Sequence, residues 1–347
     1  MGLSGHRRYS PIGIDCGATR LKAVQRARSS GAWRVSALAS VPRSNTDQPV
    51  NGEELAAFVG VLRREGFVGR QTVLAAPADI VKTTILELPP RTTSAPVDQI
   101  ARMEAARLHG REGEGFEVAT WDLPAGHRGA EATHVMATTC AHADAEPLLA
   151  ACDGVGLDVV ALEPAASALA RACRPWCEGE QVIGAVADLG WSTARLMVMH
   201  RGVPVYQRTV VDGGLRALRD ALAQRLALDV AAVSALFEAR EELQLADDAA
   251  RQVDDVVQAH AALVVAELQA AVAYASHRYP QAKPGPLVLT GGAAATMKLG
   301  ERIGAAAGME PREGCPARLM TCPTPMLHRA QDTALTVATG LSAYLDD

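Results

Sequence analysis

Aromatic residues are scarce in this chain: they make up 4% of its 347 residues, while hydrophobic residues of all kinds make up 48%. The interior must therefore be packed mainly with small aliphatic side chains. The formal net charge is only -5 and the pI is about 6.0, values that give no support for a nucleic-acid-binding protein. The length is sufficient for two domains of ordinary size.

Long apolar runs are also missing. No run approaches the roughly 20 residues that a membrane-spanning helix needs, and the polar segment Met1–Ser10 is not followed by the apolar stretch of a signal peptide. The seven cysteines are scattered, as expected of reduced thiols. Cys173 and Cys177 are one helical turn apart, but no neighbouring Cys or His completes a zinc set. We therefore expect a cytoplasmic protein without a structural metal.

Several catalytic motifs are absent as well. The sequence has no Gly-x-x-x-x-Gly-Lys-Ser/Thr loop and no His-Glu-x-x-His pair. The segment Gly190–Ala194 resembles a nucleophile elbow but lacks its final glycine. A sugar kinase would need an aspartate base in a sugar-binding motif, and we find none.

What the chain does contain is one pattern of elements twice. The strand Ile12–Asp15 ends in an Asp-x-Gly turn, and the strand Gln181–Leu189 ends in a second one at Asp188. A hairpin and then a helix follow in each half, so the architecture is repeated. In the first half we expect strands at 22–25, 33–40 and 72–76, a hairpin turn at 29–31, and a helix at 51–65 with Asn51 as its N-cap. In the second half we expect strands at 195–200, 203–211 and 287–290, and helices at 215–226, 231–242, 253–279, 294–306 and 332–344.

A different pattern lies between the two halves. Segment 77–139 has an extended run, a helix and two strands around a Gly-rich turn, which predicts a small β-α-β-β insertion. We then expect a helix at 143–151, a strand at 157–162, a helix at 164–173 and a polar linker at 175–180.

The two Asp-x-Gly turns suit a phosphate ligand. Glycine lets backbone amides approach phosphate oxygens, and an aspartate at the end of a parallel strand can hold a hydrated Mg²⁺. Lys22 can place a point charge on a phosphate. A single such turn is equally typical of a plain loop. Two of them in matching units, followed by a strand and Gly291-Gly292, predict a nucleotide held between two similar domains.

Three motifs then give the chain a specific resemblance. Gly13–Lys22 resembles the phosphate-1 motif of actin-like ATPases, Asp188–Thr193 their phosphate-2 motif, and Leu289–Ala294 their adenosine motif. Leu162–Ser167 resembles their connecting helix, and 77–139 stands where FtsA and PilM carry a small subdomain. Over nearly its whole length the chain is similar to the PilM family of type IV pilus assembly, within the actin, Hsp70 and FtsA superfamily.

This resemblance implies an α/β fold of the actin-like (ribonuclease H-like) type, duplicated in two domains with an FtsA/PilM-type inserted subdomain. The end of the chain, Ala334–Leu341, resembles PilM's terminal helix, and FtsA's membrane-targeting tail is missing. The implied division is 10–76 plus 140–175 for the first domain, 77–139 for the inserted subdomain, 181–214 plus 286–347 for the second domain, and 215–285 for a helical subdomain.

The resemblance also implies a site for ATP and Mg²⁺. Asp15 and Asp188 would hold the metal through water, and Glu163 in the connecting helix would orient the attacking water, although a helix N-terminus also favours an acid for its dipole alone. The phosphates and nucleoside would be surrounded by Gly17, Thr19, Lys22, Gly190, Ser192, Thr193, Gly291, Gly292 and Ala293.

Four departures from the family pattern count against an active ATPase. Ala18 replaces a Ser or Thr, and Trp191 replaces a small residue in the phosphate-2 motif. The segment Gly213–Leu218 lacks its usual Thr. Ser234 and Phe237 stand where relatives carry a Glu and a Lys that touch the ribose and base. Together they indicate weakened or lost nucleotide binding.

The resemblance therefore implies an assembly scaffold that binds the N-terminal cytoplasmic peptide of a PilN-like inner-membrane protein, in a groove between the first domain and the inserted subdomain. An active Mg-ATP-hydrolysing protein is the alternative. The cytoplasmic half of GspL, from type II secretion, shares the fold, so the machine that is served stays open.

Overall fold

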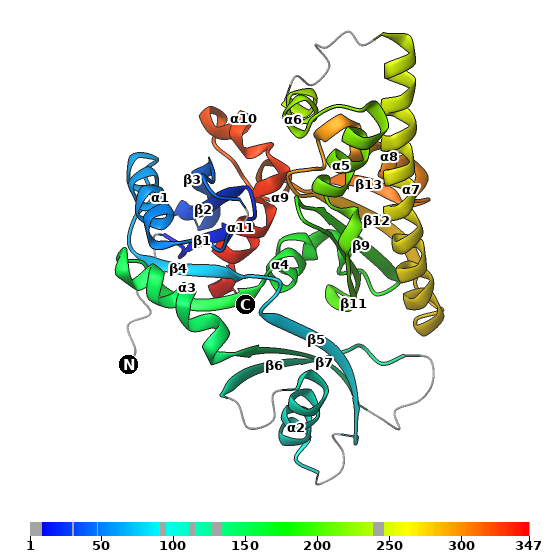
Figure 1. Ribbon diagram of the computed structural model, residues 1–347. Coiled ribbons are helices and arrows are strands. Elements are labelled where there is room, and N and C mark those ends of the chain that lie inside the picture. Colours follow the sequence, from blue (N-terminus) through cyan, green and yellow to red (C-terminus); the bar gives the residue numbers. More distant parts are fainter. Residues whose placement is uncertain are drawn as a thin grey trace.

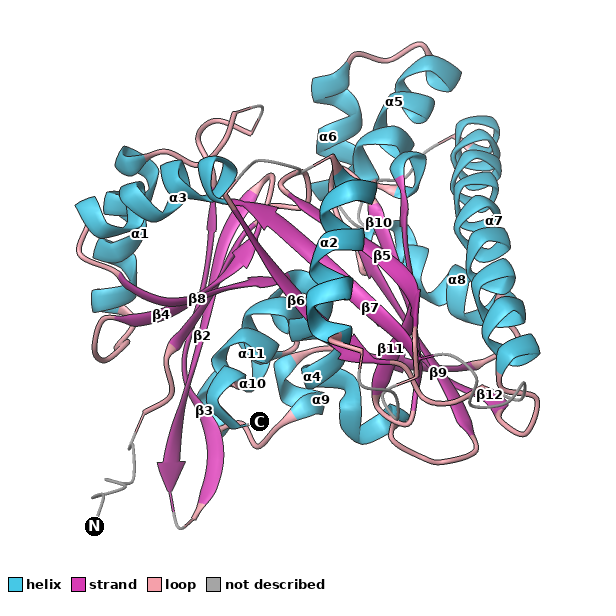
Figure 2. Cartoon of the chain, turned by 90° about the horizontal axis from the view of Figure 1, so that it is seen from below, coloured by secondary structure: helices cyan, strands magenta, loops and turns pink. Residues whose placement is uncertain are grey.

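Three β-sheets form the framework of the protein in a computed structural model, which describes residues 9–29, 31–46, 48–90, 95–110, 115–126, 133–238 and 246–346. Two five-stranded sheets stand side by side, and a three-stranded sheet lies below them (Figure 1). The helices α4 and α11 lie between the two larger sheets (Figures 1 and 2).

The first sheet has the strand order β3-β2-β1-β4-β8. Its first three strands are antiparallel, whereas β4 and β8 run parallel to β1. The side chains of Ile14, Ala23 and Leu74 are almost completely buried, in keeping with an interior of small aliphatic residues. The bounds are β1 (Ile12–Cys16), β2 (Arg20–Ser29), β3 (Ala32–Pro42), β4 (Gln71–Ala76) and β8 (Asp158–Pro164).

The second sheet repeats this arrangement with the order β11-β10-β9-β12-β13. Again three antiparallel strands form one side, and two parallel strands continue the sheet. The repeated pattern in the sequence is therefore a repeated sheet topology. The bounds are β9 (Val182–Leu189), β10 (Ala194–His200), β11 (Val203–Val210), β12 (Lys283–Thr290) and β13 (Glu310–Glu313).

The third sheet is the insertion that the sequence predicted. It has the order β5-β7-β6, is antiparallel throughout, and carries helix α2 on one face. Its opposite face meets the second sheet: Leu123 and Met136 join a core cluster with Val198 and Val205, and Trp121 Nε1 donates a hydrogen bond to the carbonyl oxygen of Pro204 (3.3 Å). The bounds are β5 (Val81–Leu88), α2 (Val97–His109), β6 (Phe116–Asp122) and β7 (Thr133–Ala141).

Helices α1 and α3 cover the outer face of the first sheet. Asn51 caps α1, because its Oδ1 accepts a hydrogen bond from the Glu54 amide (3.0 Å), which confirms the predicted N-cap. Leu55, Phe58 and Leu62 form the buried stripe of α1. The bounds of the helices on the first half are α1 (Gly52–Arg64), α3 (His142–Gly154), α4 (Ala165–Cys177) and α11 (Thr336–Ser342).

Helix α7 (Asp247–Arg278) is the longest helix of the described chain. By length and composition it could cross a membrane, with a mean hydropathy of 1.5 over its most apolar window, so the expectation that no segment is apolar enough was wrong. Here it packs against β10, β11, α5 and α8 and buries side chains such as Val264 and Leu268 in the core. The other helices of the second half are α5 (Leu215–Leu226), α6 (Val230–Glu238), α8 (Leu299–Ala306), α9 (Pro316–Leu319) and α10 (Leu327–Ala330).

Two predicted boundaries differ from the structure. Helix α4 runs to Cys177, so the expected linker at 175–180 was wrong in its first residues; the buried positions Cys173 and Cys177 continue the apolar stripe past Pro175. Helix α8 begins only at Leu299, because Met297 and Lys298 have positive φ angles and interrupt the expected helix at 294–306. Two predicted features, the turn at Ser30 and the helix end at 239–242, lie outside the described residues.

Glycines allow α11 to contact its neighbours at unusually short range. A Cβ atom at Gly340 would overlap the carbonyl oxygen of Ala168 in α4, and one at Gly13 would overlap the carbonyl oxygen of Ala338 in α11. The first sheet, α11 and α4 can therefore pack this closely only because both positions lack a side chain.

We expect Gly340→Ala to lower the free energy of unfolding by about 3 kcal/mol, because α4 and α11 would have to move apart. Urea denaturation measures the change. Gly52→Ala is the matched control, since a Cβ there meets no atom within 4 Å. Equal stability of the two variants would contradict this account of the packing.

Candidate functional site

A cavity of about 500 Å³ opens between the two large sheets. It is lined by the turns that follow β1, β9 and β12, by the end of β4, and by residues at the start of α11. This is the crevice beyond the carboxyl ends of parallel strands, where α/β proteins commonly bind ligands. Every residue that the sequence predicted to touch phosphate, nucleoside or metal lines this cavity: Asp15, Gly17, Thr19, Lys22, Asp188, Gly190, Ser192, Thr193, Gly291, Gly292 and Ala293.

Two ion pairs mirror each other across the cavity. Asp15 lies opposite Lys22 in the β1–β2 register, and Lys22 Nζ is 2.5 Å from Asp15 Oδ2. Asp188 lies opposite Arg195 in the β9–β10 register, and Arg195 Nη1 is 2.7 Å from Asp188 Oδ2. In each sheet the acid is the next-to-last residue of the first strand, and the base stands on the next strand. The duplication of the fold has thus duplicated an acid–base pair.

These pairs hold their charges in a confined space. Burial lowers the pKa of Lys22, but attraction and hydrogen bonding by Asp15 outweigh it, so the pKa lies above its usual value. Burial raises the pKa of Asp188, and Arg195 and Lys22 oppose that effect only in part. The two carboxylates are therefore already neutralised within the protein.

The turns themselves are tightly built. The Gly17 amide donates to the carbonyl oxygen of Arg20 (3.0 Å), and the Gly190 amide donates to that of Thr193 (3.1 Å). Gly291 has a φ of 91°, and a Cβ there would crowd the Asp188 carboxylate and the backbone of Leu189. Glycine is therefore required where the third turn passes close to the second.

Arg43 supports the first turn from behind. Its side chain donates to the carbonyl oxygens of Gly17 (3.4 Å) and Ala18 (3.3 Å), and it forms an ion pair with Glu54 (2.9 Å). Both side chains of the pair are almost fully buried, and the Arg43 hydrogen bond lowers the pKa of Glu54. Helix α1 and the β1–β2 turn are thereby tied together.

The departures from the family pattern lie at different places. Trp191 lines the cavity, packs against the core of the second half, and has the Arg219 guanidinium 5.1 Å from its ring. Ala18 also lines the cavity and brings no hydroxyl to it. Ser234 and Phe237 are not among the described lining residues: the Ser234 hydroxyl donates to the Val230 carbonyl within α6 (2.9 Å), and Phe237 packs on the core.

Glu163 has a partner of its own. Its carboxylate accepts two hydrogen bonds from Arg171 (2.7 and 2.9 Å), and Arg171 also donates to the carbonyl oxygen of Gly340 in α11 (3.1 Å). Glu163 is 7% exposed and is not among the described residues that line the cavity. Its geometry is that of a buried ion pair that joins β8, α4 and α11.

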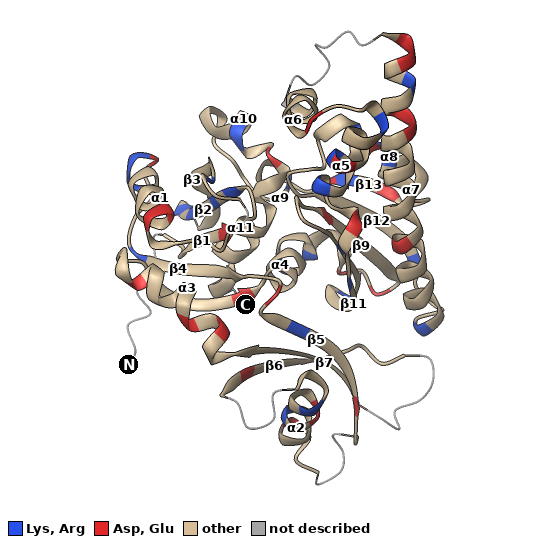
Figure 3. Ribbon diagram, in the orientation of Figure 1, with Lys and Arg blue, Asp and Glu red and all other residues tan. Residues whose placement is uncertain are grey.

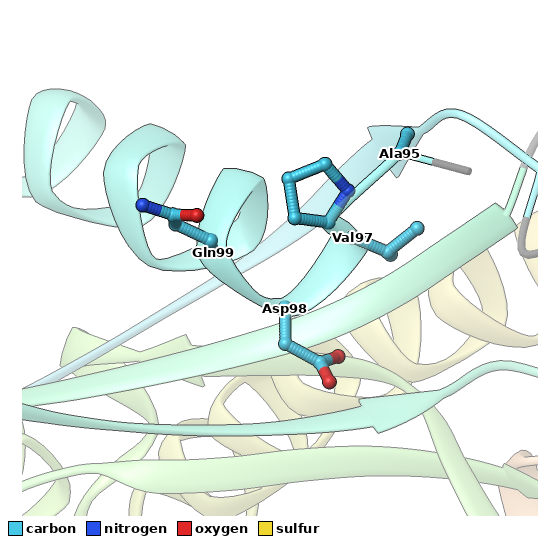
Figure 4. Close-up of a pocket in the computed structure, with 5 residues that line it drawn as sticks. Ala95, Val97, Asp98 and Gln99 are labelled. Atoms are coloured by element: carbon cyan, nitrogen blue, oxygen red, sulfur yellow. The ribbon is translucent and has the colours of Figure 1, made fainter. Parts of the chain in front are cut away.

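A second hollow of about 310 Å³ lies at the start of α2 (Figure 4). Its described lining consists of consecutive residues, so it is a surface feature of one helical turn. The cavity between the sheets, by contrast, gathers residues from both halves of the chain. The residues around the hollow are Ala95, Pro96, Val97, Asp98 and Gln99.

The donor set for Mg²⁺ does not fit this arrangement. A hydrated magnesium ion needs carboxylates that can accept hydrogen bonds from its waters, but Asp15 and Asp188 are each bonded to a cation of the protein. Within the described part of the chain, no three His, Cys, Asp or Glu side chains come together as metal ligands.

Solved structures resemble the chain over its whole length. A chain of the PilM-PilN type IV pilus biogenesis complex superposes with a TM-score of 0.74 at 19% sequence identity, covering 97% of this chain and 98% of that one. The chain has the actin-like fold. MreB 5 of Spiroplasma citri bound to AMPPNP matches with a TM-score of 0.53 at 10% identity, over 98% of this chain and 97% of that one. No family model matches the sequence.

A third structure, the ethanolamine utilization protein EutJ from Carboxydothermus hydrogenoformans, has a TM-score of 0.50 at 16% identity, over 96% of this chain and 89% of that one. Identities this low establish the fold and leave ligands and partners to be argued separately. The duplicated α/β architecture that the motifs predicted is confirmed.

Arg195 is one of the lining residues that the motifs did not predict, as are Asp79 and Thr333. It stands seven residues after Asp188, just as Lys22 stands seven residues after Asp15. Because both acids begin matching hairpins, the equal spacing places both bases directly opposite them. Aligning residues 188–195 with residues 15–22 places Arg195 at the position of Lys22.

We expect Glu163→Gln to lower the free energy of unfolding by about 3 kcal/mol, because it removes the negative charge from a buried ion pair with Arg171. Thermal or urea denaturation measures the loss. Glu310→Gln is the control: Glu310 pairs with Arg312 at the surface, where an ion pair contributes less than about 1 kcal/mol. An unchanged stability of the Glu163 variant would show that the ion pair has no structural role.

Proposed function

We propose that this protein is a PilM-like scaffold of a type IV pilus or related type II secretion platform, which binds the N-terminal cytoplasmic peptide of a PilN-like membrane protein. The observation that carries the proposal is the match to a chain of the PilM-PilN complex over 97% of this chain, inserted sheet included. The other superpositions reported above have lower TM-scores. The protein would then act in the cytoplasm and reach the membrane through its partner.

The peptide would dock between the first domain and the inserted subdomain, as the resemblance implies. We propose the domain division given above for this chain, with one refinement. Helix α11, near the chain end, packs on β1, β2 and α4 and so joins the first domain to the second.

We also propose that nucleotide binding is weak or lost. Asp188 is bonded to Arg195, Trp191 stands in the phosphate-2 turn, and Ala18 brings no hydroxyl. The geometry of the two turns supports an origin from an ATP site, whereas the paired charges favour a cavity that no longer uses a metal ion. Hydrolysis of Mg-ATP would need both aspartates released from their partners.

Peptide binding tests the scaffold function. A fluorescently labelled peptide covering the cytoplasmic N-terminus of the PilN-like protein encoded in the same genome should bind with a Kd of about 1–50 μM by fluorescence anisotropy. The same peptide in scrambled order is the control. No saturable binding up to about 500 μM would refute the proposed partner.

Replacement of Arg195 tests whether its ion pair with Asp188 weakens the binding of Mg-ATP. We expect the wild-type protein to bind Mg-ATP with a Kd above about 100 μM, and Arg195→Ser to bind it at least about tenfold more tightly, because Asp188 becomes available to a hydrated metal. The gain should vanish in EDTA. Isothermal titration calorimetry measures both. Arg208→Ser, which removes an exposed partner of Glu267, is the matched control.

Two results would contradict this view of the cavity. Low-micromolar Mg-ATP binding by the wild type, abolished by both Asp15→Ala and Asp188→Ala, would favour the active ATPase instead. Tight binding that Arg195→Ser reduces would mean that Arg195 holds the ligand and does not block the metal.

A further inference from the structure

The hairpin of β2 and β3 projects from the first sheet (Figure 2). Strand β1 pairs with β2 only as far as Val24. Further along, Tyr9 bridges Ala27 on one side of the hairpin and Thr321 bridges Arg34 on the other. The last two pairs of the hairpin, formed by residues 28–29 and 32–33, lie beyond both bridges. At about 3.3 Å per residue, this tip is roughly 16 Å from the end of the β1 pairing.

This region of the chain is basic although the protein as a whole is acidic. Residues 1–46 carry eight Lys and Arg and one acid, whereas the remaining residues carry 26 Lys and Arg against 38 Asp and Glu. All charged residues of β2 and β3 are basic, as the blue positions on β2 show (Figure 3). In the sequence, Arg7 and Arg8 directly precede Tyr9. Such a local excess of one charge indicates a partner of the opposite charge.

Two guanidinium groups lie against the ring of Trp33 near the tip. The Cζ atoms of Arg26 and Arg28 are 4.8 Å and 5.6 Å from the ring centroid. Arg26 is buried, and its Nη2 donates a hydrogen bond to the carbonyl oxygen of Ser342 at the end of α11 (2.7 Å). Arg26 therefore fixes the half-buried indole to the body of the protein.

Arg28 and Arg34 are exposed instead. Neither has a carboxylate partner within the part of the chain that the structure describes, and Arg28 Nε donates to the carbonyl oxygen of Gly31 across the turn (3.2 Å). Arg28 stands opposite Trp33 in the register, and Arg34 stands opposite Ala27, so the two cations lie on opposite faces of the hairpin. Both cations can reach a surface that the tip meets end-on.

We propose that the tip of the β2–β3 hairpin binds the surface of a membrane that contains anionic phospholipids. The guanidinium groups pair with lipid phosphates, and Trp33 lies at the level of the headgroups, where indole rings are favoured. At about 0.1 M salt the Debye length is about 10 Å, which is shorter than the projecting part of the hairpin. The acidic remainder of the protein is therefore largely screened from the membrane.

The choice of a membrane over other anionic partners rests on the proposed scaffold function, which places the protein beside a membrane-bound partner. Because a few cations give only weak binding, this contact supplements the partner and does not replace it.

Co-sedimentation with vesicles tests the contact. At about 100 mM NaCl the full chain should bind vesicles of phosphatidylcholine with about 40% phosphatidylglycerol, but not vesicles of phosphatidylcholine alone. About 500 mM NaCl should release it. No binding to the anionic vesicles, or equal binding to both, overturns the proposal. The assay contains no peptide, so its result is independent of the peptide-binding test.

Charge reversal locates the contact. Arg28→Glu/Arg34→Glu should weaken vesicle binding at least about tenfold, because two cations at the membrane become anions. Arg216→Glu/Arg225→Glu is the matched control: it changes the net charge equally at exposed positions of α5, which lies far from the hairpin in Figure 2, and should weaken binding less than about threefold. Circular dichroism melting confirms that both variants are folded. Equal effects of the two variants overturn the assignment to the hairpin.

Trp33 gives a second measurement. Anionic vesicles should move the tryptophan emission of the wild type to shorter wavelength, because an indole ring leaves water for the headgroup region. Trp33→Phe, which keeps the other three tryptophans, should show no shift. A shift that persists in this variant overturns the role of the tip. Binding of a short DNA duplex as tightly as the vesicles, with equal loss in Arg28→Glu/Arg34→Glu, would identify a nucleic acid and overturn the membrane.

Discussion

The contact of α11 with both large sheets is the constraint on which the rest of this structure depends. On the side of the first sheet, α11 approaches β1 and α4 so closely that Gly13 and Gly340 cannot carry side chains. On the side of the second sheet, the hydroxyls of Thr290 in β12 and Thr336 in α11 are hydrogen-bonded (2.6 Å). Just before α11, the Thr333 hydroxyl donates to the Gly291 carbonyl (2.8 Å) and the Gly291 amide donates to the Thr333 carbonyl (3.2 Å). The cavity lies directly beside this junction, since Thr333 and Val337 line it. Any change in the angle between the two halves must therefore act on the cavity as well.

The same junction holds the cavity in shape through contacts within the protein. Here Asp15 is bonded to Lys22 and Asp188 to Arg195, so the charges that a metal would have balanced are balanced within each sheet. The buried Glu163–Arg171 pair adds a link from β8 and α4 to the carbonyl oxygen of Gly340 in α11. The two halves are thus joined by interactions within the chain, as the proposed scaffold role would require.

Local patterns in the sequence predicted most of the fold. The Asp-x-Gly turns, the hairpins and the helix at 51–65 depend on residues that are close in the chain, and the structure has each of them in place. The predictions failed where tertiary packing decides the outcome. Helix α4 continues through Pro175 because Cys177 has a buried place to fill, and α8 starts late because Met297 and Lys298 take left-handed conformations.

For the candidate site too, local patterns predicted some features, whereas others depend on tertiary structure. Its glycines and aspartates could be found from motif spacing, but the ion pairs that alter its chemistry depend on which residue stands opposite on the next strand. Lys22 stays a predicted phosphate ligand and Glu163 a predicted catalytic group, and the structure adds their partners, Asp15 and Arg171. A sequence shows a residue's type but not its partner. Only the β9–β10 register reveals that Arg195 neutralises Asp188.

Helix α7 shows that apolar composition alone does not distinguish a membrane-spanning helix from a core helix. Its hydropathy is high enough for a membrane span because alanine, valine and leucine dominate its most apolar window. The inner face is explained by the core that it covers. Alanine's helix propensity would account for the alanines on the outer face, but it does not account for the exposure of Leu263 and Tyr274 between them. The exposed Gln258 and Gln269 stand on the same side of the helix, so this face is not apolar throughout.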